Sequence, residues 1–194
     1  MSDNYQARRV PVPKTIRGIG SRPAVSGLKI TEFGDGNYHR TVFKFTNVEI
    51  ALADEAGVVA YGSKKIYDFP AGIIANDGSV ANLAITKNSA GVNADWDGDF
   101  GLGSAAASNN NSLSTTEQNF IPTTATPQAV AGATTATGYS GATERGTTLD
   151  GHTTPIDLYL NFLVDDADHN VGGTACSLIV NGTVTVFWKN LGDY

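Results

Sequence analysis

The chain has 194 residues and a formal net charge of −6 at pH 7. This length suits a single domain with a sizeable buried core, and the acidic balance argues against a body that binds nucleic acid by charge. Charged residues make up only 16% of the chain, and Gly, Thr, Ala, Ser and Asn are abundant. That composition is typical of an all-β protein with long loops.

Compartment and membrane association can also be addressed from composition. No stretch approaches 18 apolar residues, so we expect no membrane partner. The single cysteine, Cys176, excludes an intramolecular disulfide and is expected to be buried and inert. Residues 1–23 lack the apolar core of a signal peptide. We therefore expect a protein made and kept in a reducing cytosol.

The amino-terminal segment, residues 1–24, is predicted to be an extended basic arm. Five cations against Asp3 give residues 1–22 a charge of +4, which leaves −10 for the rest and sums to −6. Its prolines favour extended backbone over helix. The segment is either a solvated terminus or an arm that reaches an acidic partner surface, such as another copy. The predicted contact residues are Arg8, Arg9, Lys14, Arg17 and Arg22.

The body, residues 25–194, is predicted to begin with three strand regions. We expect Leu28–Phe33 and Tyr38–Ile50 to be joined by a turn at Gly34–Asn37. Val58–Phe69 follows as an edge strand, because the paired lysines Lys64-Lys65 block unwanted pairing.

Two further strands are expected before the middle of the chain. A turn at Asn76–Gly78 precedes a strand at Ser79–Thr86. Alternation predicts another strand at Ala94–Leu102. Its apolar face holds Trp96, Phe100 and Leu102, and its wet face holds Asp95, Asp97 and Asp99.

The segment Gly103–Thr154 differs in kind, because it is of low complexity with few large apolar residues. We expect a loop-rich, surface-exposed insertion ordered by contacts with other elements or copies, with disorder as the alternative. Within it, Ser114–Glu117 has the pattern of a capped helical turn, with Ser114 or Thr115 as the N-cap. Thr123–Ala131 is a candidate strand.

The stretch Pro155–Lys189 carries the clearest β signal. Apolar residues alternate with polar ones in two runs, which are predicted to pair as a two-stranded ribbon around the loop Asp165–Gly173. Asn181-Gly182 favours either a hairpin turn or a bulge in one long strand. We favour the bulge, since the apolar parity continues through Gly182. The apolar positions are Leu158, Leu160, Phe162, Val164, Leu178, Val180, Val184, Val186 and Trp188.

No cluster of residues makes a convincing metal site. The acids at 95, 97 and 99 resemble a calcium loop, but Phe100 and Ala106 stand where the EF-hand pattern needs Gly and Glu. Side chains pointing to solvent are the favoured interpretation. A weak cation site is left open as an alternative at Asp95/Asp97/Asp99 or at Asp165/Asp166/Asp168.

Catalytic patterns are also incomplete. Gly138–Gly141 is one residue short of a nucleophile elbow, and Gly101–Gly103 starts a dinucleotide fingerprint that lacks its third glycine. The three histidines have no second ligand at metal spacing. We therefore expect no enzyme, no catalytic residue, no cofactor and no metal. A hydrolase with an unrecognised carboxylate pair that includes Asp97 or Asp166 is a minor alternative.

The sequence of residues 70–194 resembles small structural proteins of tailed bacteriophage virions, of the capsid decoration or cement type. The resemblance rests on several short sequence segments and not on a catalytic motif. The segments that carry it are Leu113–Pro122, Gln128–Val130, Gly146–Gly151, Leu158–His169 and Ile179–Trp188.

The resemblance implies a β-sandwich or jelly-roll-like body bound to the exterior of an icosahedral capsid after synthesis in the host bacterial cytoplasm. The implied partners are the major capsid protein and further copies, as a dimer or trimer, and the arm cations become capsid or inter-subunit contacts. Neither nucleic acid nor membrane is an expected partner. The alternative is a head-fibre, tail or baseplate module that binds host surface glycans. Its sugar-stacking candidates are Tyr61, Tyr67, Tyr139 and Trp96.

Overall fold

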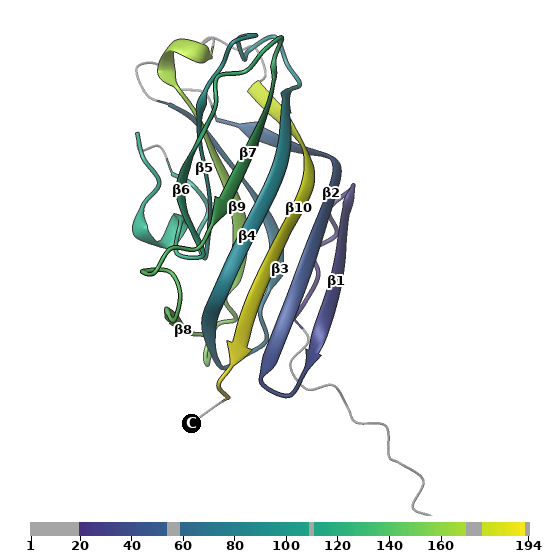
Figure 1. The fold of residues 1–194 in the computed structure, drawn as a ribbon, viewed down its shortest axis with the longest axis vertical. Coiled ribbons are helices and arrows are strands. Elements are labelled where there is room, and N and C mark those ends of the chain that lie inside the picture. Colours follow the sequence, from purple (N-terminus) through teal and green to yellow (C-terminus); the bar gives the residue numbers. More distant parts are fainter. Residues whose placement is uncertain (1–19, 54–58, 109–110, 170–175, 193–194) are drawn as a thin grey trace, which may run out of the picture.

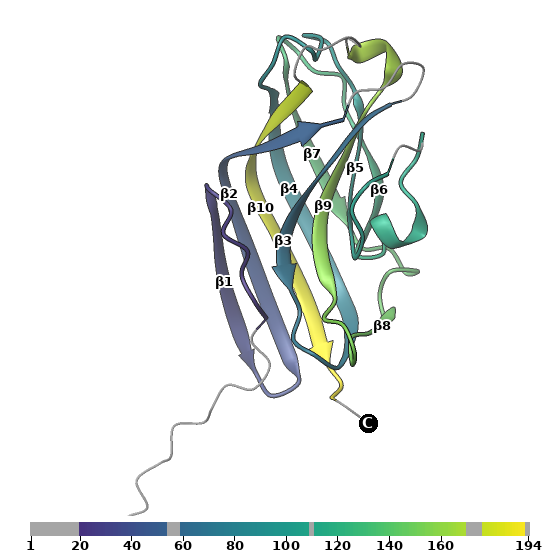
Figure 2. The same ribbon diagram turned by 180° about the vertical axis from the view of Figure 1, so that it is seen from behind.

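The computed structural model describes residues 20–53, 59–108, 111–169 and 176–192, which form two antiparallel sheets packed face to face (Figures 1 and 2). In this part of the chain the larger sheet has six strands in the order β1-β2-β10-β4-β7, with β8 beside β4, and the smaller has four in the order β3-β9-β5-β6. The predicted all-β sandwich is therefore confirmed. The strands are β1 Leu28–Asp35, β2 Tyr38–Leu52, β3 Ala60–Asp68, β4 Ile73–Lys87, β5 Gly98–Gly103, β6 Ile121–Thr126, β7 Ala133–Tyr139, β8 Thr148–Asp150, β9 Asp157–Val164 and β10 Cys176–Asn190.

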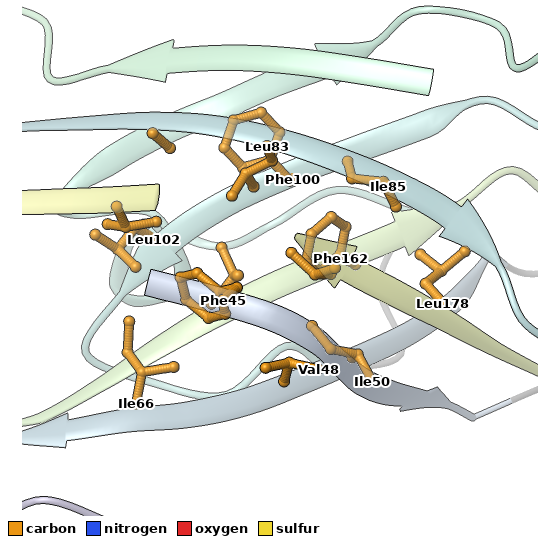
Figure 3. Close-up of a cluster of buried hydrophobic side chains, with 14 of the residues drawn as sticks. Phe45, Val48, Ile50, Ile66, Leu83, Ile85, Phe100, Leu102, Phe162 and Leu178 are labelled. Carbon is orange, nitrogen blue, oxygen red and sulfur yellow. The ribbon is translucent and has the colours of Figure 1, made fainter. Parts of the chain in front are cut away.

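The core lies between the two sheets and is built from the apolar parity of each strand. Figure 3 shows side chains from both sheets meeting there, among them Phe45 and Leu83 from the larger sheet and Phe100 and Phe162 from the smaller. All four are at most 3% exposed. Burying a side chain of this size stabilises the fold by about 1.5–3 kcal/mol. Cys176 is also buried, as predicted.

Strand β10 runs through Gly182 without a turn, which confirms the long-strand interpretation. The register with β2 shifts between Val180 and Gly182, where Thr46 and Asn47 oppose Asn181 alone. Asn47 has a φ of 52°, and its N–H donates to Asn181 Oδ1 at 2.9 Å. The bulge therefore lies in β2, and the asparagine of β10 satisfies it.

The expected ribbon of the two carboxy-terminal strands is wrong. β9 pairs with β3 and β5 in the smaller sheet, whereas β10 pairs with β2 and β4 in the larger. Each strand has one apolar face, and the two faces meet across the core instead of lying side by side. Alternation predicts which side of a strand is buried, but it does not select the neighbouring strand.

The predicted turn at Asn76–Gly78 is also wrong. β4 is continuous there, and Phe187 pairs with Gly78 while Trp188 pairs with Asn76. Asp77 is thus the extra residue of a β-bulge. Gly78 adopts a φ of 139° next to this bulge. The glycine is therefore needed for the bulge and not for a turn.

The segment 103–154 is more integrated than the expected loop-rich insertion. It supplies β6 to the smaller sheet and β7 and β8 to the larger. Phe120 and Ile121 are fully buried. Small residues suffice because these strands lie at sheet edges, where one side chain in two needs to reach the core. The order comes from contacts with other elements, as expected, and the candidate strand at Thr123–Ala131 is confirmed in its first part.

Several local predictions are confirmed. The β1–β2 hairpin turns within the predicted Gly34–Asn37, and Lys64-Lys65 lie on β3 at the edge of its sheet. Ser114 is the N-cap of a 3-10 helix, η1 Thr115–Glu117, with the predicted capping box. A second 3-10 helix, η2, covers Asp166–Asp168. Neither helix of the described chain is long and apolar enough to cross a membrane.

Candidate interaction surface

Most of the predicted contact residues cannot be placed. Arg8, Arg9, Lys14 and Arg17 lie outside the described residues, and Arg22 is exposed. The described chain begins at Gly20, whose N–H donates to Tyr67 Oη at 2.9 Å. The next residue, Ser21, forms an antiparallel bridge with Asp68 of β3. The point at which the basic segment joins the body is therefore hydrogen-bonded to β3.

The outer face of the smaller sheet is covered by the chain itself. Leu113 packs on Leu163 and Val59 in a small second core. The buried Asn161 of β9 donates its Nδ2 protons to the carbonyls of Ala105 and Glu117, at 3.0 and 2.7 Å. This cover lies over β5 and the adjoining part of β9, whereas Lys65 of β3 and Tyr159 of β9 remain part-exposed on the same face.

Glycines on β5 permit this cover. A Cβ at Gly101 would lie 2.6 Å from Leu113 Cδ1, and one at Gly103 would lie 2.1 Å from the Glu117 carbonyl carbon. The Gly101–Gly103 pattern is thus explained by close packing of η1 on the sheet.

The outer face of the larger sheet, by contrast, is open and carries exposed aromatic side chains. Figure 1 views this face, and no loop crosses its central strands in front. Phe33, Tyr38, Tyr139 and Phe187 are 46%, 64%, 66% and 43% exposed. They are four of the five large hydrophobic residues exposed in the described chain, and the fifth, Val130, precedes β7 in the chain. Aromatic side chains gathered on one exposed face are characteristic of contact surfaces.

Three of these rings are interleaved with cations at the β1–β2 hairpin end. The register places Arg40 of β2 between Phe33 of β1 and Phe187 of β10. The Arg40 guanidinium carbon lies 4.2 Å from the Phe33 ring centroid, and Lys189 Nζ lies 4.9 Å from that of Tyr38. We refer to Phe33, Tyr38, Arg40, Phe187 and Lys189 as the hairpin strip.

A buried polar network supports the hairpin strip from below. Tyr67 Oη donates to Glu32 Oε2 at 2.8 Å, and Glu32 Oε1 lies 3.4 Å from His39 Nδ1. The His39 ring stacks on Trp188, with centroids 4.1 Å apart, and Trp188 Nε1 donates to Thr41 Oγ1 at 2.9 Å. Burial and the neighbouring Glu32 carboxylate raise the pKa of Tyr67, which therefore stays protonated as the donor. The network fixes β1, β2, β3 and β10 relative to one another.

The acidic segments 95–99 and 165–168 are far apart in sequence but meet at the end of the sandwich opposite the β1–β2 hairpin. Asp97 N–H donates to Asp168 Oδ2 at 2.9 Å, and Asp165 N–H donates to Asp97 O at 3.2 Å. Burial, with hydrogen bonding and repulsion from the Asp165 and Asp168 carboxylates, raises the pKa of Asp97. Burial and Asp165 also raise that of Asp99. Among the described residues, no group of three or more His, Cys, Asp or Glu side chains is arranged to hold a metal ion.

This carboxylate cluster predicts a pH dependence of stability. With a raised pKa, Asp97 binds protons more tightly in the folded chain, so its contribution to stability is lost as pH rises through that pKa. Relative to wild type, Asp97→Asn should therefore gain stability as pH is raised from the ordinary aspartate pKa of about 3.9 towards neutrality. Urea unfolding across this range measures the difference. Asp95→Asn removes the same charge from an exposed neighbour and should change less, and equal pH profiles for the two variants would contradict the prediction.

The structure places the candidate residues for glycan binding and describes one surface pocket. Of the sugar-stacking candidates, Tyr67 and Trp96 are fully buried, which corrects the expectation that they are exposed. A surface pocket of about 330 Å³ carries one carboxylate, Glu144, whose Oε2 accepts from Gly141 N at 2.7 Å. Both ends of the Gln118 amide are engaged, by Leu113 O and by Thr123. The pocket is lined by Thr115, Gln118, Asn119, Thr143, Glu144 and Thr147.

Ser140, the serine of the incomplete elbow, has a structural role. It is buried, its hydroxyl donates to Phe120 O at 2.5 Å, and it accepts from Ser79 N–H at 2.7 Å. These bonds tie the end of β7 to β4 and leave Ser140 no position from which to attack a substrate.

The hairpin strip was not predicted from the sequence, although a signal was present. Phe187 shares the parity of Thr183, Thr185 and Lys189, so an aromatic residue stands on the wet face of β10. Tyr38 and Arg40 likewise share the exposed parity of β2. A search for large apolar residues on the polar parity of a strand would have found them.

Comparison of the chain with protein-family models, curated proteins and solved structures gives no significant match.

Proposed function

We propose that this chain is a capsid decoration protein of a tailed bacteriophage, which binds the exterior of the icosahedral shell and holds neighbouring capsomers together. Its partners are the major capsid protein and further copies of itself, as a dimer or trimer. Its role is contact between proteins, and it carries no catalytic site. The resemblance of residues 70–194 to cement proteins supports the assignment.

The observation that carries the proposal is the contrast between the two outer faces. One is covered over β5 and part of β9 by residues of the same chain around Leu113, and the other presents Phe33, Tyr38, Phe187 and Tyr139 to solvent. Keeping aromatic side chains in water forgoes hydrophobic stabilisation, so an open aromatic face favours a chain that buries it against a partner.

The energetics suit a role in stabilising a shell. A protein that binds the assembled capsid but not its separated subunits raises capsid stability by mass action. Because copies linked as a dimer or trimer engage adjacent capsomers together, modest contacts give high avidity. No deep cleft or metal centre is needed for this work.

Co-sedimentation tests the proposal. The purified chain is mixed with DNA-filled heads from a phage whose copy of this gene is deleted, and the mixture is run on a density gradient. We expect saturable binding to intact heads and none to dissociated capsid protein. The proposal fails if the chain stays at the top of the gradient at micromolar concentration.

Deleting residues 2–18 tests the contribution of the basic arm. The deletion removes Arg8, Arg9, Lys14 and Arg17 but keeps Gly20 and Ser21, which bind β3. We expect at least a tenfold loss of affinity for heads and a weaker salt dependence, because long-range attraction between the arm and an acidic surface is removed. Thermal unfolding of the deleted chain should match wild type, and normal decoration would remove the arm from the mechanism.

A further inference from the structure

Resting on the proposed function, we infer that the hairpin strip is the docking surface and that its partner is an acidic protein surface, with Arg40 as the anchor for a partner carboxylate.

The outer face of the larger sheet is net positive, although the whole chain is net negative. The cations on or over its outer face are Lys29, Arg40, Lys44, Arg145 and Lys189. The acids on this face are Glu49, Asp77 and Asp150, and Asp35 is paired in register with Tyr38, so five cations less four acids give +1. Asp77 is bound directly to Lys189, with its Oδ1 2.8 Å from Lys189 Nζ. With +4 in residues 1–22 and −6 overall, the remainder of the chain carries −11.

Hydrogen bonds link the described start of the chain to β1. Gly20, where the described chain begins, donates to Tyr67, and Tyr67 donates to Glu32, the residue before Phe33. This link passes through Tyr67 and Glu32, which are buried on the core side of β1, whereas the hairpin strip lies on the outer face of the same sheet. The positive charge of the strip favours an acidic partner surface, whereas a second copy packed face to face would oppose like charges.

Arg40 is built as an anchor. Its guanidinium lies over the Phe33 ring, and Phe187 is its partner on the other side in the strand register. Since strands are spaced by about 4.8 Å, the two rings flank the arginine across about 10 Å of sheet. Stacking holds the guanidinium plane while its N–H donors remain available for a carboxylate. Aromatic and arginine residues at the centre of a patch are the usual hot spots of protein interfaces.

The strand register extends the surface beside the strip onto β4 and β7. Gly78 continues the same row on β4, and a Cβ there would come within 3.7 Å of Arg145 Nε, so this cation lies low over the sheet. The next row runs through Val42, Thr185 and Val80 to the exposed Tyr139 of β7. Such a surface, with aromatic side chains around a central arginine, has the residue types that are enriched at protein interfaces.

The first experiment measures binding to gene-deleted heads. We expect Arg40→Glu to lower affinity at least 30-fold, and Phe33→Ser and Phe187→Ser to lower it about tenfold each. Arg40→Lys keeps the charge but loses the planar fork, and should lie between wild type and Arg40→Glu. Lys64→Glu, on the edge strand of the other sheet, makes the same charge change and should bind within threefold of wild type. Matched thermal unfolding shows that each variant is folded.

The second experiment does not depend on a phage. ¹⁵N-labelled full-length chain is titrated with poly-L-glutamate, followed at the Arg40 Nε–H and the Phe33 and Phe187 amides. We expect saturable shifts there that are absent in Arg40→Glu, with no comparable shifts from poly-L-glutamine or oligo(dT).

The outcomes separate the two proposals. If wild type fails to bind heads, the decoration role falls, and the poly-L-glutamate titration still decides the strip. If heads bind Arg40→Glu, Phe33→Ser and Phe187→Ser as well as wild type, the docking inference falls and the decoration role stands. The inference also falls if oligo(dT) or a glycan is preferred at the strip, or if Arg40→Glu abolishes a dimer of the free chain.

Discussion

A Gly182→Ala chain is expected to lose about 2–6 kcal/mol of folding free energy, from strain of about 1–3 kcal/mol in the backbone and a similar cost of steric overlap. Gly182 has a φ of 120°, and a Cβ there would lie 2.2 Å from the Asn82 carbonyl oxygen. That atom belongs to the backbone of β4, so relief requires the central strand pair to separate. Since typical domains are stable by only about 5–15 kcal/mol, we expect a large drop in the urea midpoint or insoluble protein.

Gly36→Ala is the control for this substitution. Gly36 also has a positive φ, 69°, but no atom lies within 4 Å of the position of a Cβ. The cost should be about 1–2 kcal/mol, that of a left-handed conformation alone. Equal losses in the two variants would show that strand separation is not what makes Gly182 necessary.

Trp188→Ala is expected to cost about 3–5 kcal/mol. Trp188 is 1% exposed and contacts the rings of His39, Tyr67 and Phe69. Removing it leaves a cavity beneath the hairpin strip and deprives Thr41 of its indole donor. Chemical unfolding of purified protein measures the loss.

The neighbouring position supplies a matched control. Phe187 is adjacent in sequence but points to the opposite face and is 43% exposed. Phe187→Ser should therefore cost no more than about 1 kcal/mol while it impairs docking. If Phe187→Ser were as destabilising as Trp188→Ala, the assignment of faces on β10 would be wrong.

The two substitutions separate stability from binding on one strand. Trp188 supports the network of Glu32, His39 and Tyr67 that holds the β1–β2 hairpin against β3 and β10. Phe187 lies on the outside of the same strand, in register with Arg40. A variant that keeps Trp188 and loses Phe187 should remain folded yet bind heads about tenfold more weakly.

Strand content and facing could be predicted from the sequence because both depend on near neighbours along the chain. The alternation in 178–188 correctly predicted a buried Trp188 and a continuous strand through Gly182. Lys64-Lys65 predicted an edge, and Ser114–Glu117 predicted a capped turn, since each signal is complete within a few residues.

The arrangement of the strands was decided by the tertiary structure alone. β9 and β10 have the same pattern, yet they lie in different sheets, because alternation does not distinguish a neighbour in a sheet from a partner across the core. The bulge at Asp77 and the strands β7 and β8 escaped prediction for the same reason, since they exist through pairing with distant β10 and β4. The hairpin strip likewise arises only when register brings Phe33, Arg40 and Phe187 into one row. The sequence by itself thus determined which residues are buried along each strand, and long-range pairing determined which exposed residues meet.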